Sequence, residues 1–286
     1  MNVLVTGSSG QLGSEINALA SLYKEYHFFF TDVEELDITN EIAISEYVET
    51  HKINTIINCA AYTAVDNAES EPEIADKINH IAVKNLSAIA REKSLRLIHI
   101  STDYVFNGEG FQPYATDHPT DPVNMYGLTK RKGEEAMREI NPPNSLIIRT
   151  SWVYSSFGKN FVKTMLRLGS EKDKLTVIAD QVGVPTYAKD LAVFILDHAL
   201  SAANKTVKTY HYTNEGVCSW YDFAIEIMAM GKRSCKVNPI PTANYPTPAK
   251  RPFYSLMDKE SLKKDFDTEI PYWKDSLRHC IQLLDN

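Results

Sequence analysis

A glycine-rich turn near the N-terminus constrains the fold of this chain more than any other segment. Gly7, Gly10 and Gly13 follow an apolar run at 2–6 and open a helical pattern at 11–23. Glycine allows the backbone to approach phosphate oxygens, and the first amides of a helix supply hydrogen-bond donors. The spacing is G-x-x-G-x-x-G rather than G-x-G-x-x-G, so the turn alone is a modest signal of a dinucleotide site. It is strengthened by Asp32, where a carboxylate would bond the adenosine ribose, although an acid there could also cap a turn.

The first half of the chain alternates short apolar runs with helical patterns, which is typical of parallel βα units. We expect strands at 2–6, 27–31, 55–59, 96–101 and 145–150. We expect helices at 11–23, 41–50, 74–93 and 125–140, the last ended by Asn141-Pro142-Pro143. The strands are continuous apolar runs, as expected when helices cover both faces of a sheet. The sequence therefore predicts an α/β fold with a Rossmann-type doubly wound parallel sheet.

The pattern loosens after Trp152. It predicts a helix at 161–168, a strand at 174–178 and a helix at 189–201, followed by short elements mixed with prolines. We expect 1–152 to form the dinucleotide-binding domain, with 174–204 adding a further strand and helix to it. Residues 153–173 and 205–286 are expected to form a smaller C-terminal lobe that binds substrate above the carboxyl ends of the strands.

Composition indicates an ordinary globular protein. The formal net charge of -7 disfavours a nucleic-acid or anionic-membrane surface, where basic patches are expected. No apolar run approaches the ~20 residues that span a bilayer, and the N-terminus does not have the pattern of a signal peptide. The four cysteines show no C-x-x-C spacing, so neither zinc nor a disulfide framework is indicated. We therefore expect a cytoplasmic protein with no nucleic-acid or membrane partner.

A tyrosine and a lysine one helical turn apart indicate the chemistry. Tyr126 and Lys130 lie at i, i+4 in the predicted helix at 125–140, and Thr102 follows the fourth strand. A free phenol has a pKa near ~10, and an adjacent ammonium would lower it and could also hold a nicotinamide ribose. Thr102 could donate a hydrogen bond to a substrate carbonyl while Tyr126 delivers a proton. Such a pair also occurs by chance, but its order after the glycine turn favours a reductase.

Several further residues are expected around the dinucleotide. Asp37 could cover the adenine with Ile38 or cap the helix at 41–50. Val33, not arginine, follows Asp32, so nothing obvious accommodates a 2′-phosphate, and we expect NADH to serve at least as well as NADPH. The expected cofactor-binding residues are Gly7, Gly10, Gln11, Leu12, Gly13, Asp32, Asp37, Ile38, Ala60, Ala61, Tyr62, Thr63, Tyr126 and Lys130.

These motifs make the chain resemble the extended short-chain dehydrogenase/reductase superfamily and, more narrowly, the family of dTDP-4-dehydrorhamnose reductases. The resemblance covers essentially the whole chain. It implies NAD(P)H-dependent reduction of the C4 ketone of dTDP-4-dehydro-6-deoxy-L-mannose to dTDP-L-rhamnose. The narrower signals are Ser101-Thr102-Asp103-Tyr104-Val105-Phe106, Arg149-Thr150-Ser151-Trp152-Val153-Tyr154 and Lys250-Arg251-Pro252. The substrate-binding residues that the resemblance implies are Thr102, Asp103, Tyr126, Trp152 and Arg251.

The resemblance leaves some roles open. Trp152 offers a flat apolar face to a deoxysugar but could equally be a core residue. Arg251 could pair with a diphosphate or lie on the surface. Some relatives dimerise through Mg²⁺ held by acidic side chains at positions matched by Glu15 and Asp190, but here the neighbouring residue is the cation Lys189. This argues against a metal-bridged dimer and leaves a homodimer without metal possible.

Two other functions compete with the reductase. Nucleotide-sugar dehydratases of the same superfamily carry Asp-Glu after the threonine, whereas here Asp103 is followed by Tyr104. Epimerases are harder to exclude, but they retain their cofactor and show no net oxidation of NADH. A non-catalytic regulatory subunit, like the β subunit of methionine adenosyltransferase, would bind dinucleotide without turnover.

Overall fold

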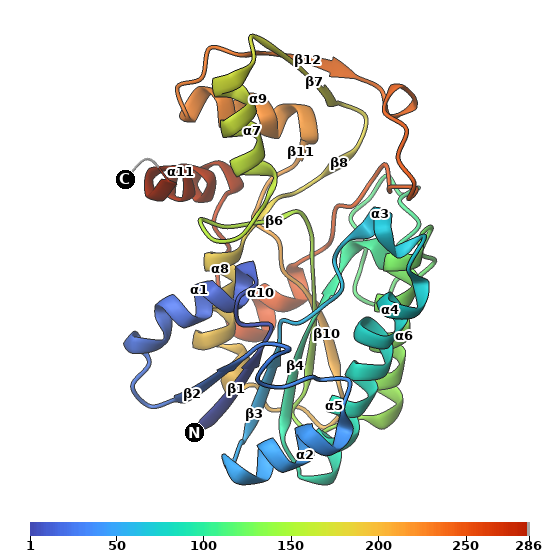
Figure 1. Cartoon of the computed structure of the whole chain (residues 1–286), viewed down its shortest axis with the longest axis vertical. Helices are drawn as coiled ribbons and strands as arrows, with labels where there is room; N and C mark the ends of the chain where they lie inside the picture. Colours follow the sequence, from blue (N-terminus) through green and yellow to red (C-terminus); the bar gives the residue numbers. More distant parts are fainter. Residues whose placement is uncertain (285–286) are drawn as a thin grey trace.

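A six-stranded parallel sheet forms the centre of the molecule (Figure 1), and the computed structural model describes residues 1–284. The strands of this sheet are β1 (Asn2–Thr6), β2 (His27–Thr31), β3 (Thr55–Asn58), β4 (Arg96–Thr102), β5 (Leu146–Thr150) and β10 (Lys208–His211). The longer helices are α1 (Gln11–Leu19), α2 (Glu41–Thr50), α5 (Ala82–Glu92), α6 (Met125–Ile140), α7 (Phe161–Glu171), α8 (Ala188–Asp197), α9 (Trp220–Met230) and α11 (Trp273–Leu284).

Short elements complete the fold. The short helices and turns are η1 (Ala20–Leu22), α3 (Val65–Ala68), α4 (Pro72–Asp76), η2 (Lys77–Ile81), η3 (Asp103–Val105), η4 (Ala199–Ser201), η5 (Thr242–Asn244) and α10 (Glu260–Phe266). The strands outside the central sheet are β6 (Val153–Tyr154), β7 (Lys174–Ile178), β8 (Val182–Gly183), β9 (Thr186–Tyr187), β11 (Cys218–Ser219) and β12 (Lys236–Ile240). Among residues 1–284, none of the helices combines the length and apolar character needed to cross a membrane.

The strand order of the central sheet reverses between β1 and β3, which places a crevice at the ends of these two strands. The order is β10-β5-β4-β3-β1-β2. From β1 the chain runs outward to β2 at one edge of the sheet, and then returns to β3 on the other side of β1 and continues toward the opposite edge. Ligands of open α/β sheets bind beyond the carboxyl ends of the strands at the point where the order reverses. The glycine turn follows β1 and therefore lies at this crevice.

Helices cover both faces of the sheet, as the apolar runs predicted. On one face, α1 and α8 pack together over a core that includes Val5, Ile57 and Ile148. On the other face, α2 and α5 enclose a core that includes Leu4 and Ile56, and α6 packs against α5 (Figure 1). The α/β fold with a doubly wound parallel sheet is confirmed.

A smaller lobe stands above the carboxyl ends of the strands and has its own core. Its helices α7, α9 and α11 and the paired strands β7 and β12 lie together in Figure 1. A separate apolar cluster, which includes Val162, Phe223 and Trp273, holds these elements together.

Most element boundaries in the first half agree closely with the sequence, but the helix predicted at 11–23 is too long, because α1 ends at Leu19 and η1 follows it. The predicted ranges of β1, β2, α2 and α6 are confirmed to the residue, and those of β3, β4 and β5 differ by one residue at one end. The predicted single helix at 74–93 is wrong in its middle: it is α4, a π-helical turn (η2) and α5. The turn places the buried Asn79 side chain on the backbone of Tyr62 and on Thr129, at 2.9–3.2 Å, which is a tertiary requirement that periodicity does not encode.

Two expectations for the second half are wrong at the level of strands. The strand at 174–178 exists, but it pairs with β12 in the lobe and does not extend the central sheet. The sixth strand of the central sheet is instead β10, which pairs in parallel with β5 although 205–286 was expected to be lobe. Both are short runs whose partners lie far along the chain, so local sequence does not choose between sheets. The residue ranges of the two domains stay a prediction.

Candidate active site

The glycine turn joins β1 to α1 by a close approach of two backbones. Gly7 has a φ of +65°, and a Cβ on it would lie 2.6 Å from the Ala60 nitrogen. A Cβ on Gly13 would lie 2.5 Å from the Gly7 carbonyl oxygen, so only glycine lets α1 start there. Gly10 is the residue before α1, and no side chain caps the first amides of the helix. These amides are therefore available to an anion.

Asp32 lies at the end of β2 beside this turn. Its carboxylate accepts hydrogen bonds from the backbone amide and the hydroxyl of Ser9. Burial raises the pKa of Asp32, but the Ser9 hydrogen bonds outweigh burial and hold the pKa below its ordinary value. Asp37 accepts from the Thr39 amide at 2.9 Å, and this bond likewise lowers the Asp37 pKa. Both carboxylates are thus ionised at neutral pH.

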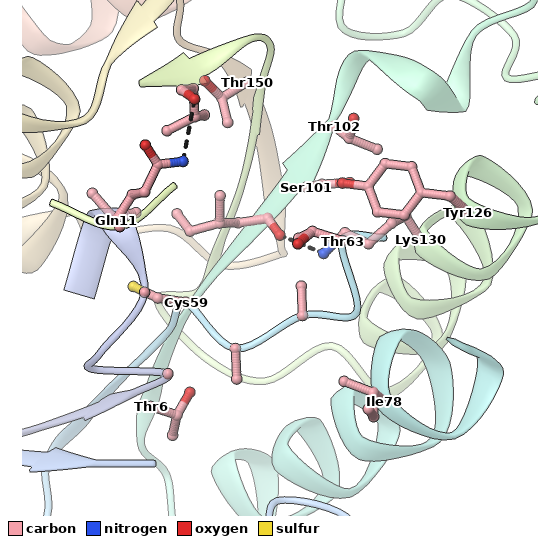
Figure 2. A pocket seen from close by; sticks show the side chains of 18 of the residues that line it. Thr6, Gln11, Cys59, Thr63, Ile78, Ser101, Thr102, Tyr126, Lys130 and Thr150 are labelled. Carbon is pink, nitrogen blue, oxygen red and sulfur yellow. Dashed lines mark hydrogen bonds between the residues drawn. The ribbon is translucent and has the colours of Figure 1, made fainter. Parts of the chain in front are cut away.

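A single large cavity of about 1110 Å³ brings most of the predicted site residues together. Figure 2 shows Thr102, Tyr126 and Lys130 on one side of it and Gln11 on the opposite side of the view. The predicted residues that line this cavity are Gly7, Gly10, Gln11, Leu12, Asp32, Asp37, Ile38, Ala60, Ala61, Thr63, Thr102, Asp103, Tyr126, Lys130 and Trp152. The glycine turn and the tyrosine–lysine pair therefore belong to one site.

Tyr126 lies in the first turn of α6, beside the last residue of β4. Burial raises the pKa of its phenol to about 12, although a hydrogen bond with the Thr102 hydroxyl partly opposes this, and the Asp103 charge adds to it. The phenol therefore holds its proton at neutral pH.

Lys130 is almost completely buried, with 1 % of its surface exposed. Its Nζ donates to the Ile100 carbonyl oxygen at 2.6 Å and lies 3.4 Å from Nε2 of His99. Burial lowers the Lys130 pKa to about 8, opposed by the charges of Glu134 and Cys59. The expectation that Lys130 lowers the pKa of Tyr126 is not met in this structure, because burial governs the phenol and the ammonium is bonded to β4.

Asp103 is buried directly beside these groups. Its Oδ1 accepts from the Thr102 hydroxyl at 3.0 Å. Burial raises the Asp103 pKa to about 7, although the Thr102 hydrogen bond opposes the rise. The cavity therefore contains a carboxyl group that changes its charge near neutral pH.

Trp152 contributes a flat wall where the lobe meets the cavity. It has a φ of +48° and stacks on Trp220, with ring centroids 3.8 Å apart and planes 15° apart. Both indoles line the cavity. Trp152 is thus not a simple core residue.

Five predicted residues do not line the cavity: Gly13, Tyr62, Arg251 and the two weak metal candidates, Glu15 and Asp190. Gly13 lies against the backbone of Gly7 within the turn. The Tyr62 hydroxyl donates to Glu71. Arg251 forms a two-pronged ion pair with Asp66, at 2.9 and 2.8 Å, so its fork is not free for a diphosphate. The predicted contact of Arg251 with a diphosphate stays a prediction.

Glu15 and Asp190, the weak candidates for a metal, are bonded within the protein. Glu15 accepts from Ser155 at 2.6 Å, and Asp190 accepts from Asn214 at 2.7 Å. Within residues 1–284 no group of three or more His, Cys, Asp or Glu side chains is arranged to hold a metal ion.

Some cavity residues were not predicted from the sequence. Lys77 lies near Asp37 and lowers the Asp37 pKa, and Lys159 precedes α7. Both could neutralise phosphate charge. No motif marks either lysine, because each reaches the cavity from a loop or an irregular turn. Ser9 was detectable in principle, since it lies inside the glycine turn.

The whole chain matches one family model, the RmlD substrate binding domain, over residues 1–286. A dTDP-4-dehydrorhamnose reductase from Aggregatibacter actinomycetemcomitans is 40% identical over 97% of this chain and 97% of that protein. A solved dTDP-4-dehydrorhamnose reductase from Clostridium acetobutylicum is 42% identical, with a TM-score of 0.93 and full coverage of both chains. Another, from Bacillus anthracis in complex with NADP, is 37% identical over 99% of each chain, with a TM-score of 0.92.

Proposed function

The chain belongs to the family of dTDP-4-dehydrorhamnose reductases, and we propose that it reduces the C4 ketone of dTDP-4-dehydro-6-deoxy-L-mannose to dTDP-L-rhamnose with NADPH or NADH. One observation supports this most: Tyr126 offers a protonated phenol in the same cavity as the glycine turn. Reduction of a ketone requires a hydride at carbon and a proton at oxygen, so a proton donor in a dinucleotide cavity matches the reaction.

The dinucleotide fits the residues present. The close approach of Gly7 to Ala60 and the uncapped amides of α1 leave backbone donors facing the cavity, where a diphosphate would lie. Asp32 is ionised and could accept from ribose hydroxyls while it holds Ser9. A bound reduced nicotinamide would supply the hydride. The expectation that NADH serves at least as well as NADPH stays a prediction. Lys77, which lines the cavity, would offer a cation to a 2′-phosphate.

The side chains around the ketone have separate tasks. Thr102 orients the phenol of Tyr126 and can bond the carbonyl oxygen. When the phenol gives its proton to that oxygen, solvent returns a proton to the phenolate that remains. The Lys130 ammonium, which is bonded to β4 and lines the cavity, would hold the nicotinamide ribose. Trp152 and Trp220 present an apolar wall to the methyl face of a deoxysugar. Asp103 can accept from a sugar hydroxyl.

The alternatives fit less well. A dehydratase needs a second carboxyl group after Asp103, and Tyr104 stands there. A regulatory subunit needs no proton donor, yet Thr102 and Tyr126 are hydrogen-bonded in the cavity. We also propose a cytoplasmic location, supported by four unpaired cysteines, and leave a homodimer as a prediction.

The test is oxidation of NADPH or NADH followed by absorbance, with the dTDP-ketosugar as substrate and the matching UDP- and GDP-ketosugars as controls. Turnover that requires the dTDP sugar supports the proposal. Dinucleotide binding without turnover, together with a stable complex with another enzyme, would favour the regulatory subunit. Tight retention of dinucleotide without net oxidation would favour an epimerase.

A further inference from the structure

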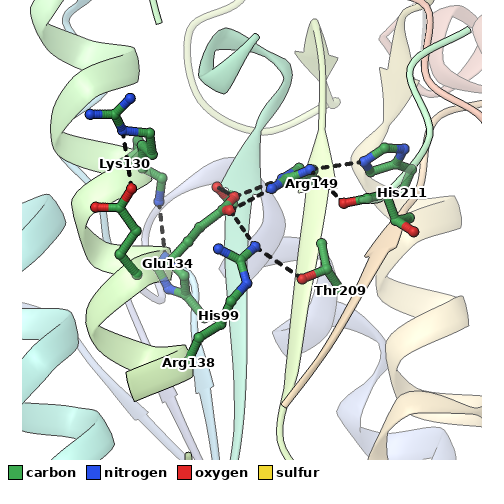
Figure 3. A network of polar contacts seen from close by, with 11 residues as sticks. His99, Lys130, Glu134, Arg138, Arg149, Thr209 and His211 are labelled. Carbon is green, nitrogen blue, oxygen red and sulfur yellow. Dashed lines mark hydrogen bonds and ion pairs between the residues drawn. The ribbon is translucent and has the colours of Figure 1, made fainter. Parts of the chain in front are cut away.

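The Lys130 ammonium contacts two residues of β4, Ile100 and His99, which belong to none of the functional motifs. Its Nζ donates to the Ile100 carbonyl at 2.6 Å and faces Nε2 of His99 at 3.4 Å (Figure 3). An ammonium has three hydrogens. These two acceptors take two of them and leave one for the cavity.

The contact with His99 is the end of a buried polar chain across three strands. Nδ1 of His99 lies 3.1 Å from the Asn58 side-chain nitrogen, and Oδ1 of Asn58 accepts from the Thr6 hydroxyl at 2.7 Å. The residues are cross-strand neighbours, because Thr6 pairs with Asn58 and Asn58 pairs with His99. Each is no more than 1 % exposed. Thr6 and Lys130 both line the cavity, so this chain of polar contacts connects two parts of the cavity wall.

The chain can serve Lys130 in its charged form. Burial, followed by the charge of Lys130, holds the His99 pKa well below its ordinary value, so the imidazole is neutral. A neutral imidazole has one donor and one acceptor nitrogen. An ammonium at Nε2 makes Nε2 the acceptor and places the imidazole hydrogen on Nδ1. Nδ1 then needs an acceptor, which the Asn58 oxygen provides when the side-chain amide is rotated by 180° so that its oxygen faces Nδ1. The Thr6 hydroxyl fits either orientation of the amide because it both donates and accepts.

The other titratable groups near Lys130 are Glu134, Cys59 and, in the same cavity lining, Tyr126 and Asp103, whose carboxyl group changes its charge near pH 7 in the parent and in every variant alike. Glu134 lies one turn along α6, and Cys59 follows β3; both raise the Lys130 pKa. Glu134 is already paired with Arg149 of β5 and with Arg138, each at 2.7 Å (Figure 3). His99 differs from them because it bonds the ammonium from β4 without adding charge.

We infer that His99, oriented by Asn58, is a positioning residue that aims the Lys130 ammonium at the cavity and keeps it protonated. The inference rests on the role proposed above for Lys130. Loss of a hydrogen-bond acceptor disfavours the charged form of a buried amine. Without His99, Lys130 would release its proton at a lower pH and would keep only the Ile100 carbonyl as an acceptor from β4.

The pH dependence of NADPH binding tests this without any turnover. In the parent protein we expect binding to weaken as the pH rises through the Lys130 pKa of about 8. His99→Leu should move that transition down by about one pH unit and weaken binding at pH 8 by roughly fivefold. His99→Gln should restore most of both, because a glutamine oxygen reaches the position of Nε2.

A matched control separates positioning from packing. His211 is also fully buried, and its Nε2 also lies 3.4 Å from a cation, Nη1 of Arg149. His211→Leu should lower stability like His99→Leu while leaving the pH transition in place. A second variant acts in the opposite direction: Asn58→Asp places a carboxylate at Nδ1 of His99 and should move the transition to higher pH.

The outcomes distinguish this inference from the proposed function. A folded His99→Leu protein with the parent's pH dependence of NADPH binding overturns the inference, and so does a folded Asn58→Asp protein without an upward shift. If the pH transitions move as expected but no dTDP-ketosugar is reduced, the inference holds and the proposed function is wrong.

Discussion

At the scale of the residue, Tyr126 combines a fixed ring with a proton that it keeps. The ring packs edge-on against Tyr104, with centroids 5.5 Å apart, and burial raises the phenol pKa to about 12. Tyr126→Phe keeps this packing and removes only the hydroxyl. We expect kcat to fall by roughly 100-fold or more while NADPH still binds. Steady-state kinetics with a separate NADPH titration measures this; near-parent kcat would show that another group delivers the proton.

Asp103 gives the site a pH dependence of its own. Its ordinary pKa is near ~3.9, and burial raises it to about 7 in the folded protein. The folded state therefore holds this proton more tightly than the unfolded chain, and the associated stability is present at low pH and is lost as pH rises through about 7.

Asp103→Asn removes that loss because an amide does not ionise. We expect the stability of the variant relative to the parent protein to rise by about 2.6 kcal/mol from pH 5 to pH 8. Thermal unfolding at the two pH values measures the gain. A stability difference that does not change with pH would show that the carboxyl group has an ordinary pKa.

At the scale of the element, α6 carries both Tyr126 and Lys130, so its first turn sets their positions. Oδ1 of Asn124 accepts from the Gly127 amide, and its Nδ2 donates to the Lys250 carbonyl, both at 2.8 Å. One side chain thus caps the helix and ties it to the C-terminal segment that lies beside the site.

Asn124→Ala should lose the cap and the tie together. We expect a loss of about 1 kcal/mol in urea unfolding and a higher KM for the sugar substrate. Asn40→Ala is the matched control, because Asn40 caps α2 through the Ala43 amide at 3.1 Å and lies outside the lining of the cavity. It should lose similar stability with no change in KM. Equal KM effects would show that the tie to Lys250 does not matter.

At the scale of the whole molecule, the ion pair of Arg251 and Asp66 joins the C-terminal segment to α3. Partly exposed ion pairs contribute only about 0.5–1 kcal/mol to stability. We therefore expect the main effect of this pair to be on the position of the C-terminal segment relative to α3. We expect Asp66→Asn and Arg251→Met each to raise the KM for the sugar, and the double variant to raise it no further. If only Arg251→Met raises KM, the arginine binds substrate directly.

The sequence alone determined the features that depend on local order along the chain. The glycine turn, the first strands, α6 and the pair Tyr126 and Lys130 follow from apolar periodicity and from spacings of a few residues. Such patterns are readable because backbone geometry translates spacing directly into direction: one turn of helix, or one strand end at a shared edge. The two-part α/β architecture follows from the same patterns.

Only the tertiary structure decided which distant groups meet. It placed β10 rather than β7 in the central sheet, occupied Arg251 with Asp66, and set His99 and Asn58 behind Lys130. It also raised the Tyr126 pKa where an adjacent lysine predicted a fall. The reason is physical: pairing, burial and protonation depend on what a side chain touches in space, and those partners lie tens of residues away in the chain.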